Sequence, residues 1–151
     1  MSAFIGAIQN ISTMTAMLDL YVYDDGIAVC RGATVRALVA RTASEYSAAR
    51  LHGESAFRQA VAEANERDFA RAANLAGLTH AQLIAADPKN RFVALSKIAS
   101  ARLSRRWDGS SRLELTLTDQ TRQKYTWKRV YNDPEKAAGI LRTALGDRLS
   151  V

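Results

Sequence analysis

The stretch that most constrains the fold of this chain runs from Trp107 to Arg129 and reads WDGSSRLELTLTDQTRQKYTWKR. Three leucines alternate with polar residues in its first half, and after a short turn Tyr125 and Trp127 alternate with lysine and threonine. A period of two sends successive side chains to opposite faces of a strand. The stretch therefore predicts a β-hairpin with one apolar face, which carries both of these aromatic rings, and one polar, basic face. Trp107 falls at a turn, where we expect it to be exposed.

A second hairpin is predicted from LDLYVYDDGIAVCR, residues 18–31. Its turn runs from Asp24 to Gly26, because Asp and Gly tolerate positive φ. Tyr21 and Tyr23 fall on the polar side of its first strand. Cys30 lies in its second strand, where the pattern predicts a small buried hydrophobe.

Between this hairpin and the later strands, residues 33–86 have a helical period and balanced charge, and we interpret them as an insertion packed on the sheet. Near its end, Thr79 and Gln82 have the spacing of a capping box, which predicts a short helix. Further strands are predicted at residues 91–95 and 98–106.

The chain is predicted to close with a helix at about residues 134–145. Asp133 is a suitable N-cap, Pro134 suits the first helical position, and Gly146 suits the end. The apolar stripe of this helix places three large side chains in the core: Ile140, Leu141 and Leu145.

Three stretches of this sequence follow a known domain pattern: LTHAQLIAADPKNRFVALSKIASARL, LELTLTDQTRQKYTW and DPEKAAGILRTALGDRL. The first looks like a short helix followed by a strand and a bend, the second like a central hairpin, and the third like a capping helix. In this order they resemble the bacterial pleckstrin-homology-like (PH-like) domains, over residues 78–149 and more weakly over residues 18–31.

The resemblance implies an α+β fold in one domain of residues 1–151. It implies a strongly bent antiparallel sheet, or partly open barrel, capped by the C-terminal helix, with the helical insertion at about 33–86 between the second and third strands. It also implies a binding platform for membranes, peptides or proteins. The lipid-binding members take phosphoinositide at a basic loop between their first two strands. Here that loop would run from Asp24 to Gly26, and its acidity argues against the same site.

No pattern in the sequence predicts catalysis. There is no nucleophile elbow and no phosphate-binding loop, and His52 and His80 have no cysteine or carboxylate pair at ligand spacing. We therefore predict no catalytic residue, no metal ion, no cofactor and no enzymatic activity. The single cysteine and the lack of a long apolar run or signal peptide suit a cytoplasmic protein, with peripheral attachment to the membrane as an option.

Positive charge is concentrated in one segment. The chain has a net charge of +6, and residues 89–131 alone carry eleven bases against three acids, a net of +8. A localised excess of this kind indicates an anionic partner more strongly than a uniform excess does. The alternative is a solvated basic face that aids solubility.

The predicted strand registers make this basic face more specific. With Asp119–Thr121 as a three-residue loop, Leu115 faces Tyr125, Leu113 faces Trp127, and Arg112 lies directly opposite Lys128. Pairing Leu103 with Leu115 then puts Arg106 opposite Arg112. Like charges in direct opposition cost stability, and such local conflicts tend to mark functional sites. The candidate site for an anion or a partner comprises Arg102, Arg106, Arg112, Lys124 and Lys128.

We therefore predict a non-enzymatic interaction module that binds an acidic protein segment or an anionic membrane surface through this face. A nucleic-acid-binding domain that uses the same face is an alternative, although stacking aromatics are lacking there. A third alternative is a structural module that forms homo-oligomers through the helical insertion.

Overall fold

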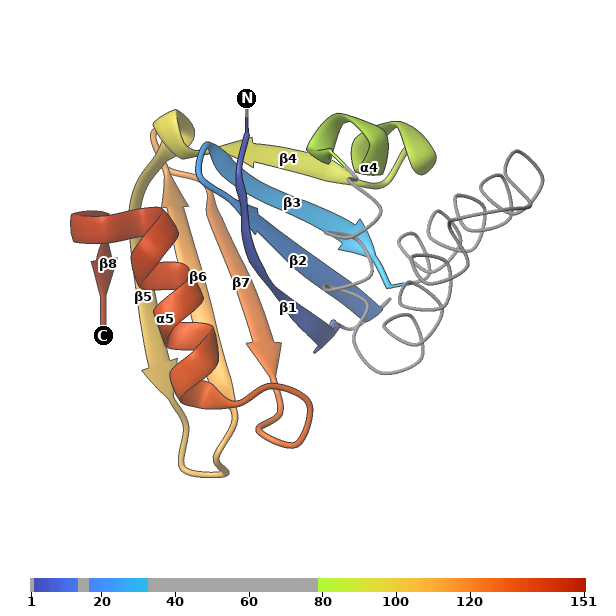
Figure 1. The fold of residues 1–151 in the computed structure, drawn as a ribbon. Helices are drawn as coiled ribbons and strands as arrows, with labels where there is room; N and C mark the ends of the chain where they lie inside the picture. Colours follow the sequence, from blue (N-terminus) through green and yellow to red (C-terminus); the bar gives the residue numbers. More distant parts are fainter. Residues whose placement is uncertain (1, 14–16, 33–78) are drawn as a thin grey trace, which may run out of the picture.

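The computed structural model describes residues 2–13, 17–32 and 79–151, and these form an α+β fold (Figure 1). They contain eight strands in two four-stranded sheets and two α-helices. The two sheets do not close into a barrel. The first sheet, here sheet A, has the order β1-β2-β3-β4, and the second, sheet B, has the order β7-β6-β5-β8.

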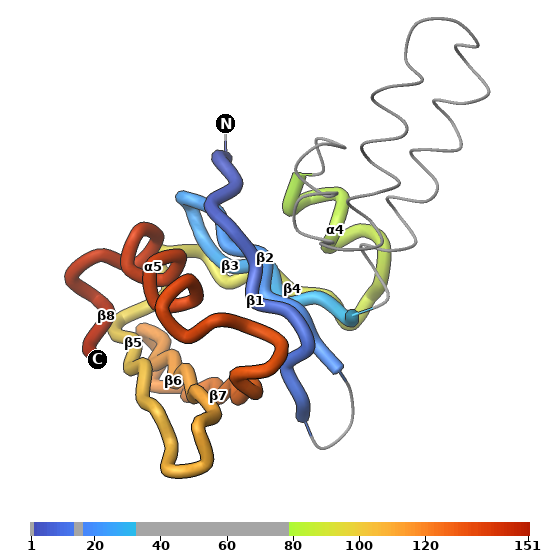
Figure 2. Tube along the Cα trace, turned by 60° about the horizontal axis from the view of Figure 1, so that its bottom comes forward, coloured from blue at the N-terminus to red at the C-terminus, as the bar shows by residue number. Residues whose placement is uncertain are grey.

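Sheet A is an antiparallel meander of consecutive strands. Its strands are β1 (Phe4–Ser12), β2 (Met17–Tyr23), β3 (Gly26–Arg31) and β4 (Arg91–Ala94). The helix α4 (His80–Ala86) precedes β4 and lies on the side of sheet A away from the C-terminal helix (Figure 2). The predicted capping box is confirmed, because Gln82 N donates to Thr79 Oγ1 and Thr79 N donates to Gln82 Oε1.

Sheet B holds the predicted basic hairpin. Its strands are β5 (Ile98–Arg105), β6 (Ser111–Leu117), β7 (Arg122–Trp127) and the short β8 (Leu149–Ser150). The first three pair antiparallel, whereas β8 pairs in parallel with β5.

The core lies between the two sheets, and the C-terminal helix α5 (Pro134–Leu145) closes it. The predicted start is confirmed, since Asp133 accepts a hydrogen bond from Lys136 N. Leu141 and Leu145 are buried as predicted, whereas Ile140 is only partly buried and packs against Gly6. A Cβ at Gly6 would lie 2.6 Å from Ile140 Cδ1, so the helix sits directly on the β1 backbone.

Sheet A has an unpredicted first strand, β1. The turn from Asp24 to Gly26 therefore joins the second and third strands, and its assignment to the first two strands is wrong. The insertion likewise enters after the third strand and before the fourth, not after the second. Most of it, residues 33–78, and the predicted oligomer contact there lie outside the described residues.

The central strands of sheet A, β2 and β3, are buried on both faces. Tyr21 and Tyr23, predicted on the polar side of the hairpin, are 0% and 2% exposed. Cys30 is fully buried, as predicted, and burial raises the pKa of its thiol to about 12. Within the described ranges, no helix is long and apolar enough to span a membrane.

Candidate anion-binding site

Arg102, Arg112 and Lys124 lie on the outer face of sheet B, while Arg106 and Lys128 directly follow β5 and β7. On β6, Ser111, Leu113 and Leu115 are buried, and the even-numbered residues between and after them are partly exposed. Arg102, Lys124 and Lys128 are exposed, as is Arg106 at the end of β5, while Arg112 is partly exposed. The prediction of one apolar and one basic face is therefore confirmed.

The predicted register of the central hairpin is wrong by two residues. Leu113 lies opposite Tyr125, and Leu115 lies opposite Gln123. The loop starts one residue earlier than predicted, because Leu117 N donates to Thr121 O. The loop is residues 118–120, and Gln120 adopts a φ of 71°, the left-handed conformation that often completes a three-residue hairpin loop.

The shift removes the predicted row of opposed cations. Arg112 lies between Ser104 and Thr126 instead of between Arg106 and Lys128. A shift of two residues keeps every side chain on its face but changes its neighbours, so the face was predicted correctly and its pairs were not. The conflict of like charges on which the site prediction rested is absent.

Two of the five cations lie beside an acid. Glu114 is opposite Arg102 on β5 and Lys124 on β7. Its carboxylate is 4.0 Å from Lys124 Nζ and 3.7 Å from a guanidinium nitrogen of Arg122. The charges of Arg102, Glu114 and Lys124 therefore alternate in sign across the three strands. As a result, the electrostatic potential at the middle of the face is less positive than the number of cations there indicates.

The structure brings Arg106 and Lys128 together at one end of sheet B, where both line a cavity of about 250 Å³. Arg106 sits in the β5–β6 loop, which a hydrogen bond of 2.8 Å from Arg106 N to Ser110 O holds closed. The remaining lining residues come from β1, β2, the β5–β6 loop, β7 and the segment after β7: Asn10, Ser12, Met17, Asp108, Ser110, Thr126, Trp127 and Tyr131.

This lining is rich in hydrogen-bonding groups. Trp127 is 1% exposed, and its indole Nε1 has no hydrogen-bond partner among the described residues. A buried donor without an acceptor is uncommon in native structures, and a bound acceptor would satisfy it. Asp108 is the one acid in the lining. Its carboxylate accepts hydrogen bonds from Ser110 N and Ser110 Oγ, and these hold its pKa below the usual range.

Asn10 and Ser12 were not predicted in the site because β1 was not predicted, and Met17 opens β2 one residue before the predicted hairpin. Gly6, Ala7 and Asn10 weaken the strand pattern of FIGAIQNIS, which also contains two register irregularities. The apolar positions Phe4, Ile8 and Ile11 have the spacing of a helical stripe and not the period of two of a strand.

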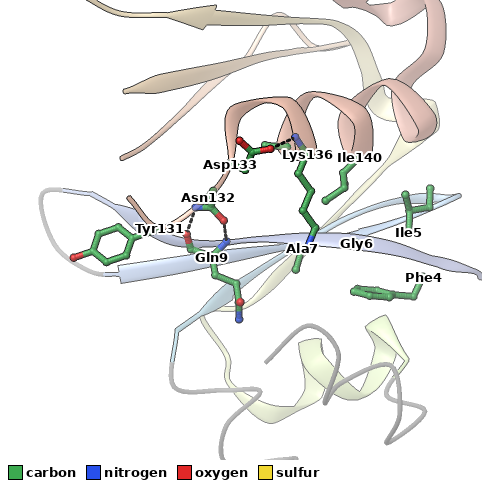
Figure 3. Close-up of a pocket in the computed structure, with 11 residues that line it drawn as sticks. Phe4, Ile5, Gly6, Ala7, Gln9, Tyr131, Asn132, Asp133, Lys136 and Ile140 are labelled. Atoms are coloured by element: carbon green, nitrogen blue, oxygen red, sulfur yellow. Dashed lines mark hydrogen bonds between the residues drawn. The ribbon is translucent and has the colours of Figure 1, made fainter. Parts of the chain in front are cut away.

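A larger cavity, of about 490 Å³, lies between β1 and α5 (Figure 3). The Asn132 side chain bridges the two elements here, because its Oδ1 accepts from Gln9 N and its Nδ2 donates to Gln9 O. These two bonds occupy the edge of β1 as a neighbouring strand would. Lys136 and Asp133 are the charged residues in the lining, so this cavity has no excess of positive charge.

A third polar cluster joins the N-terminus to α4. Ser2 Oγ lies 2.5 Å from Asp25 Oδ2 and 2.9 Å from His80 Nε2, and that same nitrogen is 3.2 Å from Asp25 Oδ2. In a catalytic triad the carboxylate and the hydroxyl contact different nitrogens of the imidazole. Here they share one, so the cluster lacks the geometry of nucleophilic catalysis.

Within the described parts of the chain, no three or more His, Cys, Asp or Glu side chains are grouped to hold a metal ion. Comparisons of the sequence and structure with models of protein families, with curated proteins and with solved structures find no match.

Proposed function

We propose that this chain is a non-enzymatic interaction module that binds an anionic partner at the cavity between Arg106 and Lys128. The observation that carries the proposal is the convergence of these two cations, one from the β5–β6 loop and one from the residue after β7, on one concave site. Anionic oxygens accept hydrogen bonds from both groups. Arg112, with a buried Nε that has no partner among the described residues, extends the basic surface along the same face.

We also infer that the fold follows the PH-like plan. The order of elements supports this inference: an antiparallel meander of four strands, then one of three strands, then a helix that closes the core. With β1 included, the loop between the first two strands falls at residues 13–16 rather than at the acidic turn. The cavity takes in Asn10, Ser12 and Met17 on either side of that loop. The acidic turn from Asp24 to Gly26 is therefore no longer a reason to exclude an anion site at the loop between the first two strands.

The test compares two variants with the same change in charge. Arg106→Gln/Lys128→Gln removes the cavity cations, whereas Arg102→Gln/Lys124→Gln removes the two that flank Glu114. We would measure binding to phosphatidylglycerol-containing vesicles, to poly-glutamate and to duplex and single-stranded DNA at low and high salt.

We expect the cavity variant to lose about thirtyfold in affinity for its preferred probe, since each cation near an anionic surface contributes about 1 kcal/mol. The control variant should lose less, and high salt should weaken wild-type binding. Equal losses in the two variants would show that only the overall charge matters, and an unchanged cavity variant would overturn the proposal.

A nucleic-acid-binding role is the second candidate, and one observation favours it. Trp107, next to Arg106, is 94% exposed and could stack on an unpaired base. Preference for DNA over vesicles and poly-glutamate at the same salt would select this role.

A further inference from the structure

The large apolar side chains that the described residues expose are concentrated at one end of the molecule. Trp107 is 94% exposed, Val130 79%, Tyr131 56% and Met17 45%. The fifth such residue, Val151, lies at the C-terminus. Large side chains of this kind are usually scattered singly on a surface, so four at one end mark an interaction site.

Two of these four residues line the basic cavity, and the other two are neighbours in the chain of residues that line it. Met17 and Tyr131 line it, Trp107 directly follows Arg106, and Val130 directly precedes Tyr131. The β5–β6 loop and the segment between β7 and α5 both lie at the end opposite the β2–β3 and β6–β7 turns (Figures 1 and 2).

The same two loops carry more bases than acids. Residues 105–110 and 128–131 contain four bases, Arg105, Arg106, Lys128 and Arg129, and one acid, Asp108, a net of +3. Arg105 is 3.5 Å from the exposed Glu135, an arrangement that solvent and salt screen strongly. The apolar side chains and the cations therefore occupy the same surface.

From this placement, and resting on the proposed function, we propose that the anionic partner is the surface of a lipid bilayer. In this arrangement Trp107, Val130 and Tyr131 enter the interfacial region, while Arg106 and Lys128 meet lipid phosphates at the cavity. Tryptophan and tyrosine favour the boundary between headgroups and acyl chains, because their rings are apolar and their N–H or O–H groups remain hydrogen-bonded.

The shape of the site favours a bilayer over a folded acidic protein. The apolar side chains project from loops around the cavity, and Trp107 is almost completely exposed. A folded partner would need a preformed pocket for each projecting side chain. A fluid bilayer accepts them without one, and binding grows with the apolar area inserted plus the attraction to anionic lipid.

Trp107 provides a direct readout, because the other tryptophan, Trp127, is buried in the core. We would titrate the full chain with phosphatidylcholine vesicles with and without phosphatidylglycerol and record tryptophan emission. Acyl chains brominated near the headgroup would serve as quenchers. Insertion predicts a blue shift and quenching with the anionic vesicles, and Trp107→Phe should abolish the quenching while binding persists.

A matched pair of variants tests the contact without a spectroscopic probe. Val130→Ser and Val151→Ser remove the same side chain from positions 79% and 78% exposed, so neither should alter folding. We expect Val130→Ser to weaken sedimentation with anionic vesicles severalfold and Val151→Ser to leave it unchanged. Equal effects of the two variants would overturn the insertion.

The outcomes separate this inference from the proposed function. If the cavity cations are needed for binding but Trp107 shows no shift or quenching, the partner is anionic without insertion, and only the bilayer inference fails. Binding to poly-glutamate or DNA but not to vesicles has the same meaning. If Arg106→Gln/Lys128→Gln binds every probe as well as wild type, both proposals fail.

Discussion

The outer faces of the two sheets of this protein differ in how far they are buried. In sheet A, β2 and β3 are buried on both sides, so that Asp19 and Tyr21 are 4% and 0% exposed. In sheet B, β6 alternates between buried and partly exposed residues from Ser111 to Thr116. In the sequence, β2 of sheet A and β6 of sheet B both alternate along one strand, so the alternation alone did not show which outer face would be covered.

The difference indicates where a partner can bind. A polar face that the protein itself covers contributes to stability, and its groups are used within the fold. Asp19, for example, accepts hydrogen bonds from Asn10 N and Tyr21 Oη. The outer face of sheet B remains available, and Arg112 on this face pairs with Ser104 and Thr126, so it has no acid opposite it.

The largest expected contrast between the two faces comes from Tyr21→Ala and Lys124→Ala. The first removes a fully buried aromatic side chain and should lower the free energy of unfolding by about 3–5 kcal/mol. The second removes an exposed side chain 4.0 Å from Glu114 and should change it by less than about 0.5 kcal/mol. Chemical denaturation measures both, and similar values would mean that the two faces are equally covered.

A smaller effect tests how closely sheet A is packed at its β2–β3 turn. A Cβ at Gly26 would meet the carbonyl oxygen of Val93 and Cζ of Phe92, so Gly26→Ala should cost about 1–3 kcal/mol. The control is Gly139→Ala on the exposed side of α5, where a Cβ meets nothing within 4 Å. Alanine there should stabilise by about 0.5–1 kcal/mol. A neutral Gly26→Ala would show that the turn can move away from β4.

The smallest expected effect is the pH dependence of stability that arises from the buried carboxyl of Asp19. Burial raises its pKa above the ordinary value of 3.8, so the folded state binds a proton more tightly than the unfolded state. Stability contributed by this group is therefore greatest below about pH 4 and declines as pH rises through the folded-state pKa. Asp19→Asn should remove that decline, because the amide does not ionise.

The measurement is the free energy of unfolding of wild type and Asp19→Asn between about pH 4 and 7, taken as a difference so that other groups cancel. We expect wild type to lose stability relative to the variant as pH rises. A constant difference would mean that the hydrogen bonds from Asn10 and Tyr21 fully offset the effect of burial.

Much of the fold was predictable because its signals are local. The cap at Asp133, the end at Gly146 and the box at Thr79 each involve groups within one helical turn. The burial of Tyr125 and Trp127 followed from their parity along one strand. Strand β1 was not predictable in this way, because it has no regular alternation and pairs with β2 through two irregularities.

The candidate site was predictable only in part. Parity placed Arg106, Arg112 and Lys128 on the same face, but the loop of the hairpin began one residue earlier than its composition indicated. Asp119 accepts a hydrogen bond from Thr121 N and Gln120 takes the left-handed conformation, which makes residues 118–120 the loop. The turn geometry thus decided which cations lie opposite one another.

The sequence by itself determined the direction of each side chain in the predicted strands and the limits of both described helices, since these depend on residues a few positions apart. Only the tertiary structure decided that Tyr21 would be covered and Arg102 exposed, and that Met17 and Tyr131 would meet at one cavity with Arg106 and Lys128. Whether a side chain is covered, and which residues meet at a cavity, depends on how distant segments of the chain pack together. A strand of either sheet presents the same local pattern before that packing occurs.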